Sequence, residues 1–126
     1  MELRIDSATD QVILAALVER DGRRAARLMV NYYGLAVFEE CCRRVGRREL
    51  AEDLTQVAFA RAFAALAEFG GRRSAREWLV AVAHECCAEY LRAHPEAGGS
   101  TGIEGEERAA IGESIRRRLE VLAAAV

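Results

Sequence analysis

Apolar residues recur every three or four positions through most of this chain, and only one proline interrupts 126 residues. That spacing places apolar side chains along one face of an α-helix. The residues that dominate the composition, Leu, Ala, Arg and Glu, all favour helix. Hydrophobic residues make up 52% and charged residues 30%, which is typical of a soluble globular protein with one core. The sequence therefore predicts an all-α fold.

Five helices are expected, over residues 10–20, 23–45, 49–69, 74–94 and 106–125. Ser74 and Glu77 form a capping box at the start of the fourth, and Pro95 ends it. The stripe of the third helix that should face the core is Leu50, Leu54, Val57, Phe63 and Leu66. We expect a compact bundle of about four helices, followed by a C-terminal helix.

A segment rich in Gly, with Ser and Thr, separates that last helix from the bundle. It predicts a helical domain over residues 1–95, a flexible linker over 96–105 and an amphipathic helix over 106–126. The last helix carries one apolar face, formed by Ile111, Ile115, Leu119 and Leu122. Three roles stay open for it: the start of a further domain, a tail that packs back on the core, or a helix that pairs with a second copy.

The formal net charge is −2 and all eighteen basic residues are Arg, so any DNA contact must come from a local cluster. No signal peptide or long apolar run is visible, which predicts a cytoplasmic location with reduced thiols. The Cys residues form two adjacent pairs, Cys41-Cys42 and Cys86-Cys87, without the spacing of a zinc site. We expect buried structural Cys and neither a metal nor a cofactor. No nucleophile–base pair stands out, so an enzyme is not expected.

Two motifs point to a family. The third expected helix reads Glu52-Asp53-Leu54-Thr55-Gln56-Val57-Ala58-Phe59, and the fourth runs from Trp78-Leu79 to Arg92. Their order and spacing resemble region two of bacterial sigma factors, especially the extracytoplasmic-function group. The resemblance covers about residues 10–94. It implies a region-two bundle that acts in transcription initiation.

The resemblance implies that one face of the third helix binds core RNA polymerase, at the clamp helices of its largest subunit. Asp53 and Gln56 are three positions apart, so they lie on one side of the helix. We expect these two to make the contact, with Glu52 and Arg61 as helpers. An ordinary solvated face is the alternative explanation of this polar pair.

The resemblance also implies that the fourth helix and the loop before it capture the non-template strand of the minus-ten promoter element. Such capture needs cations along the strand. The expected DNA-binding residues are Arg72, Arg73, Arg76, His84, Glu85 and Arg92. Trp78 lies on the apolar stripe, so we expect it in the core rather than stacked on a base.

The chain departs from the family pattern where Glu85 replaces the usual Asn and Glu89 the usual Asp. An ionised Glu can only accept hydrogen bonds, and it repels phosphate. This favours an alternative: a sigma-like protein-interaction module or regulator that has lost promoter reading. Its partner would be polymerase, an anti-sigma factor or a second copy joined through the C-terminal helix. Neither interpretation involves a membrane.

Overall fold

The computed structural model describes residues 7–99, 102 and 105–126. These form five α-helices and two short 3-10 turns. Their bounds are α1 Ser7–Val18, α2 Gly22–Arg44, α3 Arg48–Ala64, η1 Leu66–Glu68, α4 Ala75–Ala93, η2 Pro95–Ala97 and α5 Gly105–Ala124. The predicted all-α fold is confirmed. Within the described ranges, no helix has the length and apolar character needed to cross a membrane.

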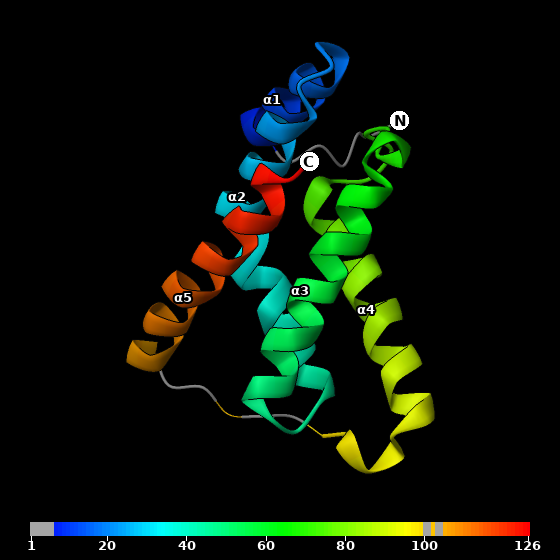
Figure 1. Ribbon diagram of the computed structural model, residues 1–126, viewed down its shortest axis with the longest axis vertical. Helices are drawn as coiled ribbons and strands as arrows, with labels where there is room; N and C mark the ends of the chain where they lie inside the picture. The colour runs from blue at the N-terminus through cyan, green and yellow to red at the C-terminus, as the bar shows by residue number, and fades with distance from the viewer. Residues whose placement is uncertain (1–6, 100–101, 103–104) are drawn as a thin grey trace.

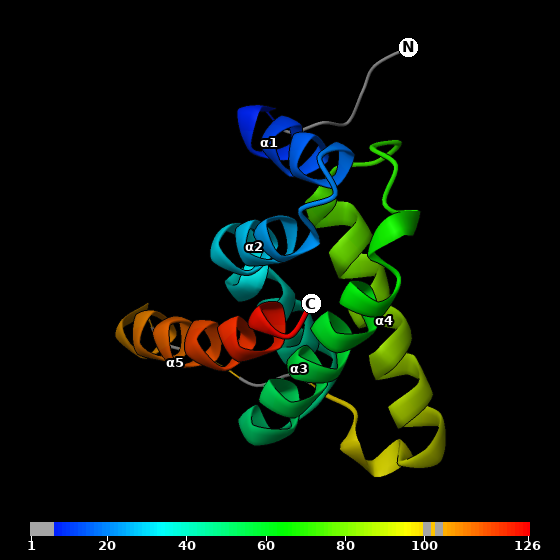
Figure 2. The ribbon, with the colours of Figure 1, turned by 45° about the horizontal axis from the view of Figure 1, so that its top comes forward.

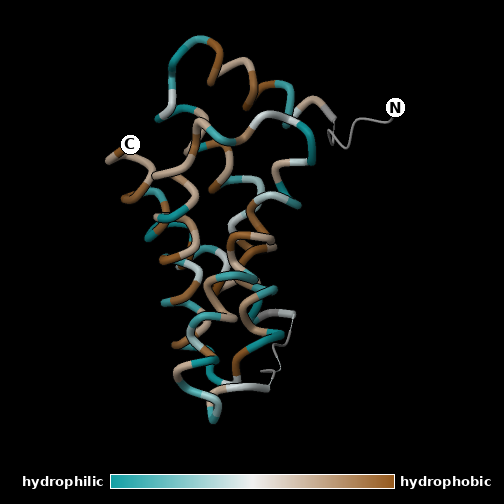
Figure 3. Tube along the Cα trace, turned by 90° about the vertical axis from the view of Figure 1, so that its right-hand side faces the viewer, coloured by the Kyte–Doolittle hydropathy of each residue, from teal (hydrophilic) through white to brown (hydrophobic). Residues whose placement is uncertain are grey.

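The long helix α2 is the centre of the bundle and packs against the four other helices. In Figure 1, α3 lies in front, with α5 on one side of it and α4 on the other. The first helix, α1, lies across one end of the bundle (Figure 2). Hydrophobic and hydrophilic residues are interspersed along the chain (Figure 3), and buried side chains from all five helices form one core. Among its fully buried side chains are Ile13, Phe38, Phe59, Leu79 and Leu119.

Helix α3 differs from the prediction in length and at one position of the stripe that was expected to face the core. It ends at Ala64, and η1 follows in place of a helix to residue 69. Val57, predicted to lie in the core, is 45% exposed. The rest of the predicted stripe is confirmed, because Leu50, Leu54 and Leu66 are buried and Phe63 packs against the core. Four small residues share the buried face: Ala51, Thr55, Ala58 and Ala62. Large apolar residues therefore marked most of the inner face of α3 but not its small buried residues.

The predicted start of α4 is confirmed. The Ser74 hydroxyl accepts a hydrogen bond of 3.0 Å from the backbone N–H of Glu77. A second acceptor comes from α1: the carboxylate of Asp10 accepts a hydrogen bond of 2.9 Å from the backbone N–H of Ala75. Such acceptors satisfy N–H groups that the first turn of a helix leaves without partners. The helix ends at Ala93, directly before His94 and Pro95.

Helix α5 packs back on α2 and α3, which is one of the three roles left open for it. Its side chains Ile111, Ile115 and Leu119 are buried within the chain, so they are not available to pair with a second copy. The approach to α2 is close: a Cβ on Gly34 would lie 3.3 Å from Cδ1 of Leu119. Within the predicted linker, the carbonyl of Ala97 accepts the N–H of Gly46, and residues 100, 101, 103 and 104 lie outside the described residues.

All four Cys side chains are buried as free thiols, which confirms the burial predicted for them. Burial raises the pKa of Cys42 to about 11 and also raises that of Cys86. A hydrogen bond with Cys87, reinforced by burial, raises the pKa of the Cys41 thiol. These three thiols are therefore protonated at neutral pH and behave as small apolar side chains.

Candidate functional site

The outward side of α3 lies open between α4 and α5 (Figure 1). Asp53 and Val57 are exposed there, and Gln56 is half-buried beside them. We call this surface the α3 strip; its members are Glu49, Asp53, Gln56, Val57 and Ala60. Among the residues that the structure describes, Asp53 forms no ion pair or hydrogen bond through its side chain. The predicted pair Asp53 and Gln56 is thus brought together on a surface that a partner can reach.

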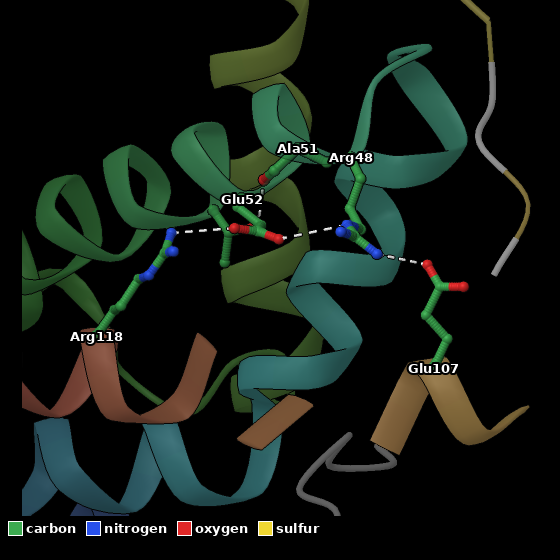
Figure 4. A network of polar contacts seen from close by, with 6 residues as sticks. Arg48, Ala51, Glu52, Glu107 and Arg118 are labelled. Carbon is green, nitrogen blue, oxygen red and sulfur yellow. Dashed lines mark hydrogen bonds and ion pairs between the residues drawn. The ribbon is translucent and has the colours of Figure 1, made fainter. Parts of the chain in front are cut away.

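Glu52 does not point outward with that pair. Its carboxylate lies 3.0 Å from a guanidinium nitrogen of Arg118 on α5 and 3.7 Å from one of Arg48 (Figure 4). Arg48 in turn pairs with Glu107 on α5. The Glu52 side chain is only 16% exposed. This residue therefore joins α3 to α5 at the edge of the α3 strip, and the sequence motif alone did not show that.

Arg61, the other predicted helper, lies on the opposite side of α3. It follows Glu52 by nine positions, which at ~100° per residue puts the two side chains about 180° apart. Two guanidinium nitrogens of Arg61 donate to the two carboxylate oxygens of Glu89 on α4, both at 3.1 Å. The hydrogen bonds raise the pKa of Arg61 and lower that of Glu89. Arg61 therefore links α3 to α4 at the other edge of the strip.

The strip continues into a shallow groove that sequence reasoning missed. Its volume is about 270 Å³, and it lies between the last turns of α3 and the end of the chain. The lining residues are Ala60, Phe63, Ala64, Leu122, Ala125 and Val126. No local pattern marks this groove, because it forms only where α5 comes to rest beside α3.

Three of the predicted DNA-binding residues gather at the start of α4. Arg72, Arg73 and Arg76 are all exposed, and we call them the arginine segment. Within the described part of the chain, none of the three forms an ion pair. Trp78 is partly buried and packs on Phe69, with ring centroids 5.5 Å apart. Trp78 therefore supports the loop from within, in agreement with the prediction.

The other predicted DNA-binding residues lie farther along α4. His84, Glu85 and Arg92 are all exposed. Arg92 follows Glu85 by two helical turns, so the two side chains share one side of α4. Glu89 is exposed one turn from Glu85, and its charge is met by Arg61. The outward face of α4 is therefore close to neutral, and positive charge is concentrated in the arginine segment.

Comparison with known proteins agrees with this architecture. The family described as sigma-70 region 2 matches residues 18–95. Two curated relatives are the probable RNA polymerase sigma-C factor of Mycobacterium bovis and the ECF RNA polymerase sigma factor SigC of Mycobacterium tuberculosis. Each is 48% identical over 42 residues, which are 33% of this chain and 23% of the relative.

The aligned part of the chain thus spans less than a quarter of the length of these relatives. No solved structure matches the chain with significance. The family match is much longer, since it runs from the end of α1 through α2, α3 and α4 and covers more than half of the chain. The chain therefore belongs to the sigma-70 region 2 family.

Proposed function

We propose that this chain acts in transcription initiation by binding core RNA polymerase through the α3 strip. The observation that carries the proposal is the outward-facing pair Asp53 and Gln56, beside the exposed apolar Val57. A polar pair next to an apolar side chain suits a protein interface, where hydrogen bonds give orientation and apolar contact gives affinity. The names of the curated relatives, both RNA polymerase sigma factors, support the same partner.

Core RNA polymerase should retain the wild-type chain in a pull-down and lose the double variant Asp53→Ala, Gln56→Ala. We expect an affinity loss of about tenfold or more, because residues at the centre of an interface each cost upwards of about 1 kcal/mol when truncated. Gln11→Ala and Glu19→Ala, exposed positions on and just after α1, are matched controls. Equal retention of the double variant and the controls would remove the α3 strip from the interface.

Glu52 and Arg61 are proposed to contribute less to this binding than Asp53 and Gln56. Each already has a partner within the chain, Arg118 for Glu52 and Glu89 for Arg61. Breaking an existing ion pair to make a new one returns little net free energy. Their proposed role is to hold α5 and α4 at the two edges of the strip.

The second part of the proposed function is contact with the single-stranded minus-ten promoter element through the arginine segment. Exposed guanidinium groups without ion-pair partners can approach phosphates without first breaking a contact. Phosphate neutralisation supplies most of the affinity in this kind of binding. Arg92 and His84, farther along α4, are proposed to extend the path of the strand.

The alternative is a sigma-like interaction module that does not read DNA, and the exposed carboxylate of Glu85 favours it. A single-stranded minus-ten oligonucleotide separates the two functions. If the alternative holds, the wild-type chain binds weakly and Glu85→Asn binds more tightly, because the substitution removes a charge that repels phosphate and adds a donor. Glu96→Gln, which removes an exposed charge beyond α4, controls for net charge. Tight, salt-sensitive binding by the wild type would rule the alternative out.

A further inference from the structure

One carboxylate joins three helices at the end of the bundle where the arginine segment lies. Asp10 of α1 is fully buried. The Tyr33 hydroxyl of α2 donates to its Oδ1 at 2.8 Å, and the backbone N–H of Ala75 donates to its Oδ2 at 2.9 Å. A buried carboxylate is tolerated only when such donors satisfy it. The positive end of the α4 dipole, at Ala75, also favours a negative charge at this place.

A second contact with α1 is made by the loop that leads into α4, just before the arginine segment. Gly71 has a φ of 80°, in the left-handed region that favours glycine. A Cβ at Gly71 would come within 2.9 Å of Cδ1 of Leu14, so the loop backbone rests directly on this side chain. Asp10 and Leu14 are one turn apart and lie on the same face of α1. Arg72 and Arg73 are therefore held between two anchors, Gly71 before them and Ala75 after them.

We propose that Asp10 is a positioning residue that sets the arginine segment for contact with phosphates. The inference rests on the proposed DNA contact and extends it to a residue outside 18–95, the part of the chain that matches the family. Long arginine side chains in solvent bind a strand well only if the backbone beneath them is already in place, since ordering it on binding costs affinity. Asp10 supplies that order by fixing the first residue of α4 to α1 and α2.

Asp10→Asn is the sharpest test because it keeps the size of the side chain. An amide offers one oxygen in place of two, so it cannot accept from both Tyr33 and Ala75 in the present geometry. We expect about tenfold weaker binding to a single-stranded DNA oligonucleotide of about 12 nucleotides. The salt dependence should fall as well, by about 0.7 in the log–log slope for each phosphate that the variant no longer neutralises. Gln11→Ala, the exposed neighbour of Asp10, should bind as the wild type does.

Two local measurements separate positioning from a general loss of stability. The amide of Ala75 should exchange its hydrogen faster in Asp10→Asn, whereas the amide of Leu54 in α3 should exchange as before. Trp78 is the only tryptophan in the chain and lies in the first turns of α4, so its fluorescence emission should shift. Leu14→Ala removes the side chain on which Gly71 rests, so it should weaken DNA binding and shift the Trp78 emission as Asp10→Asn does. It replaces Asp10→Asn as the test if that variant does not fold.

The outcomes distinguish this inference from the function on which it rests. If the wild type binds the oligonucleotide and both Asp10→Asn and Leu14→Ala bind with the same affinity and salt slope, Asp10 is not a positioning residue. If the wild type does not bind the oligonucleotide at all, the proposed DNA contact is wrong, and the inference that rests on it is wrong as well. Weaker binding with a reduced salt slope, faster exchange at Ala75 and an unchanged pull-down by core RNA polymerase would establish the positioning role.

Discussion

Replacing Leu119 with alanine lowers the free energy of unfolding by about 2–5 kcal/mol, the usual cost of truncating a fully buried Leu. Leu119 is 0% exposed, and its Cδ1 lies against the backbone of α2 at Gly34. The site can relax little, because α5 is also held by Ile115 and by the pair between Arg118 and Glu52. Urea denaturation followed by circular dichroism measures the change, with the slope checked for two-state behaviour.

Val121→Ala is the matched control on the same helix, because Val121 is 71% exposed. It should leave the unfolding free energy within about 0.5 kcal/mol of the wild type. If Leu119→Ala is as harmless as this control, α5 does not pack on α2 and α3 in solution. Sedimentation would then show whether its apolar face pairs with a second copy.

Replacing Phe59 with alanine costs about 3–5 kcal/mol of unfolding free energy, the range for a fully buried aromatic side chain. Phe59 is 0% exposed and packs edge-on against Phe63, with ring centroids 5.7 Å apart. The same denaturation experiment measures the loss. Polymerase binding, measured where the variant is still folded, should persist because Phe59 does not reach the α3 strip.

Val57→Ala is the counterpart on the outer side of α3. Val57 is 45% exposed, and alanine is the better helix former, so stability should change by less than about 1 kcal/mol. Binding to polymerase, in contrast, should weaken if Val57 supplies the apolar contact of the strip. A large loss of stability in this variant would mean that Val57 lies in the core, as its place in the apolar pattern suggests.

The helices could largely be predicted from local signals. The Ser74 cap depends on residues within one turn of the chain, and the structure agrees with it. The small and polar residues on the inner face of α3 could not be predicted in this way. Thr55 is fully buried because its hydroxyl donates to the carbonyl of Ala51, which removes the cost of burying a polar group. A search for large apolar residues at helical spacing does not identify a buried polar residue such as Thr55.

The candidate site also has a part that the sequence predicted and a part that it did not. The motif placed Asp53 and Gln56 on one side of a helix, and that geometry needs only the helical repeat. The ion-pair partners of Glu52 and Arg61, in contrast, depend on which helices lie beside α3. Glu52 meets α5 and Arg61 meets α4, through partners 66 and 28 positions away in the sequence (118 − 52 and 89 − 61).

Helix content, the cap of α4 and the spacing of the family motifs follow from residues close together in the chain, since helices form from contacts within one turn. The folded arrangement was needed to show that α5 rests on α2 and α3, that Val57 faces solvent and that Asp10 reaches the first residue of α4. Each of these depends on packing between segments far apart in sequence. Burial of shared apolar surface drives that packing. The spacing within one helix shows that it has an apolar face but not which other helix that face will meet.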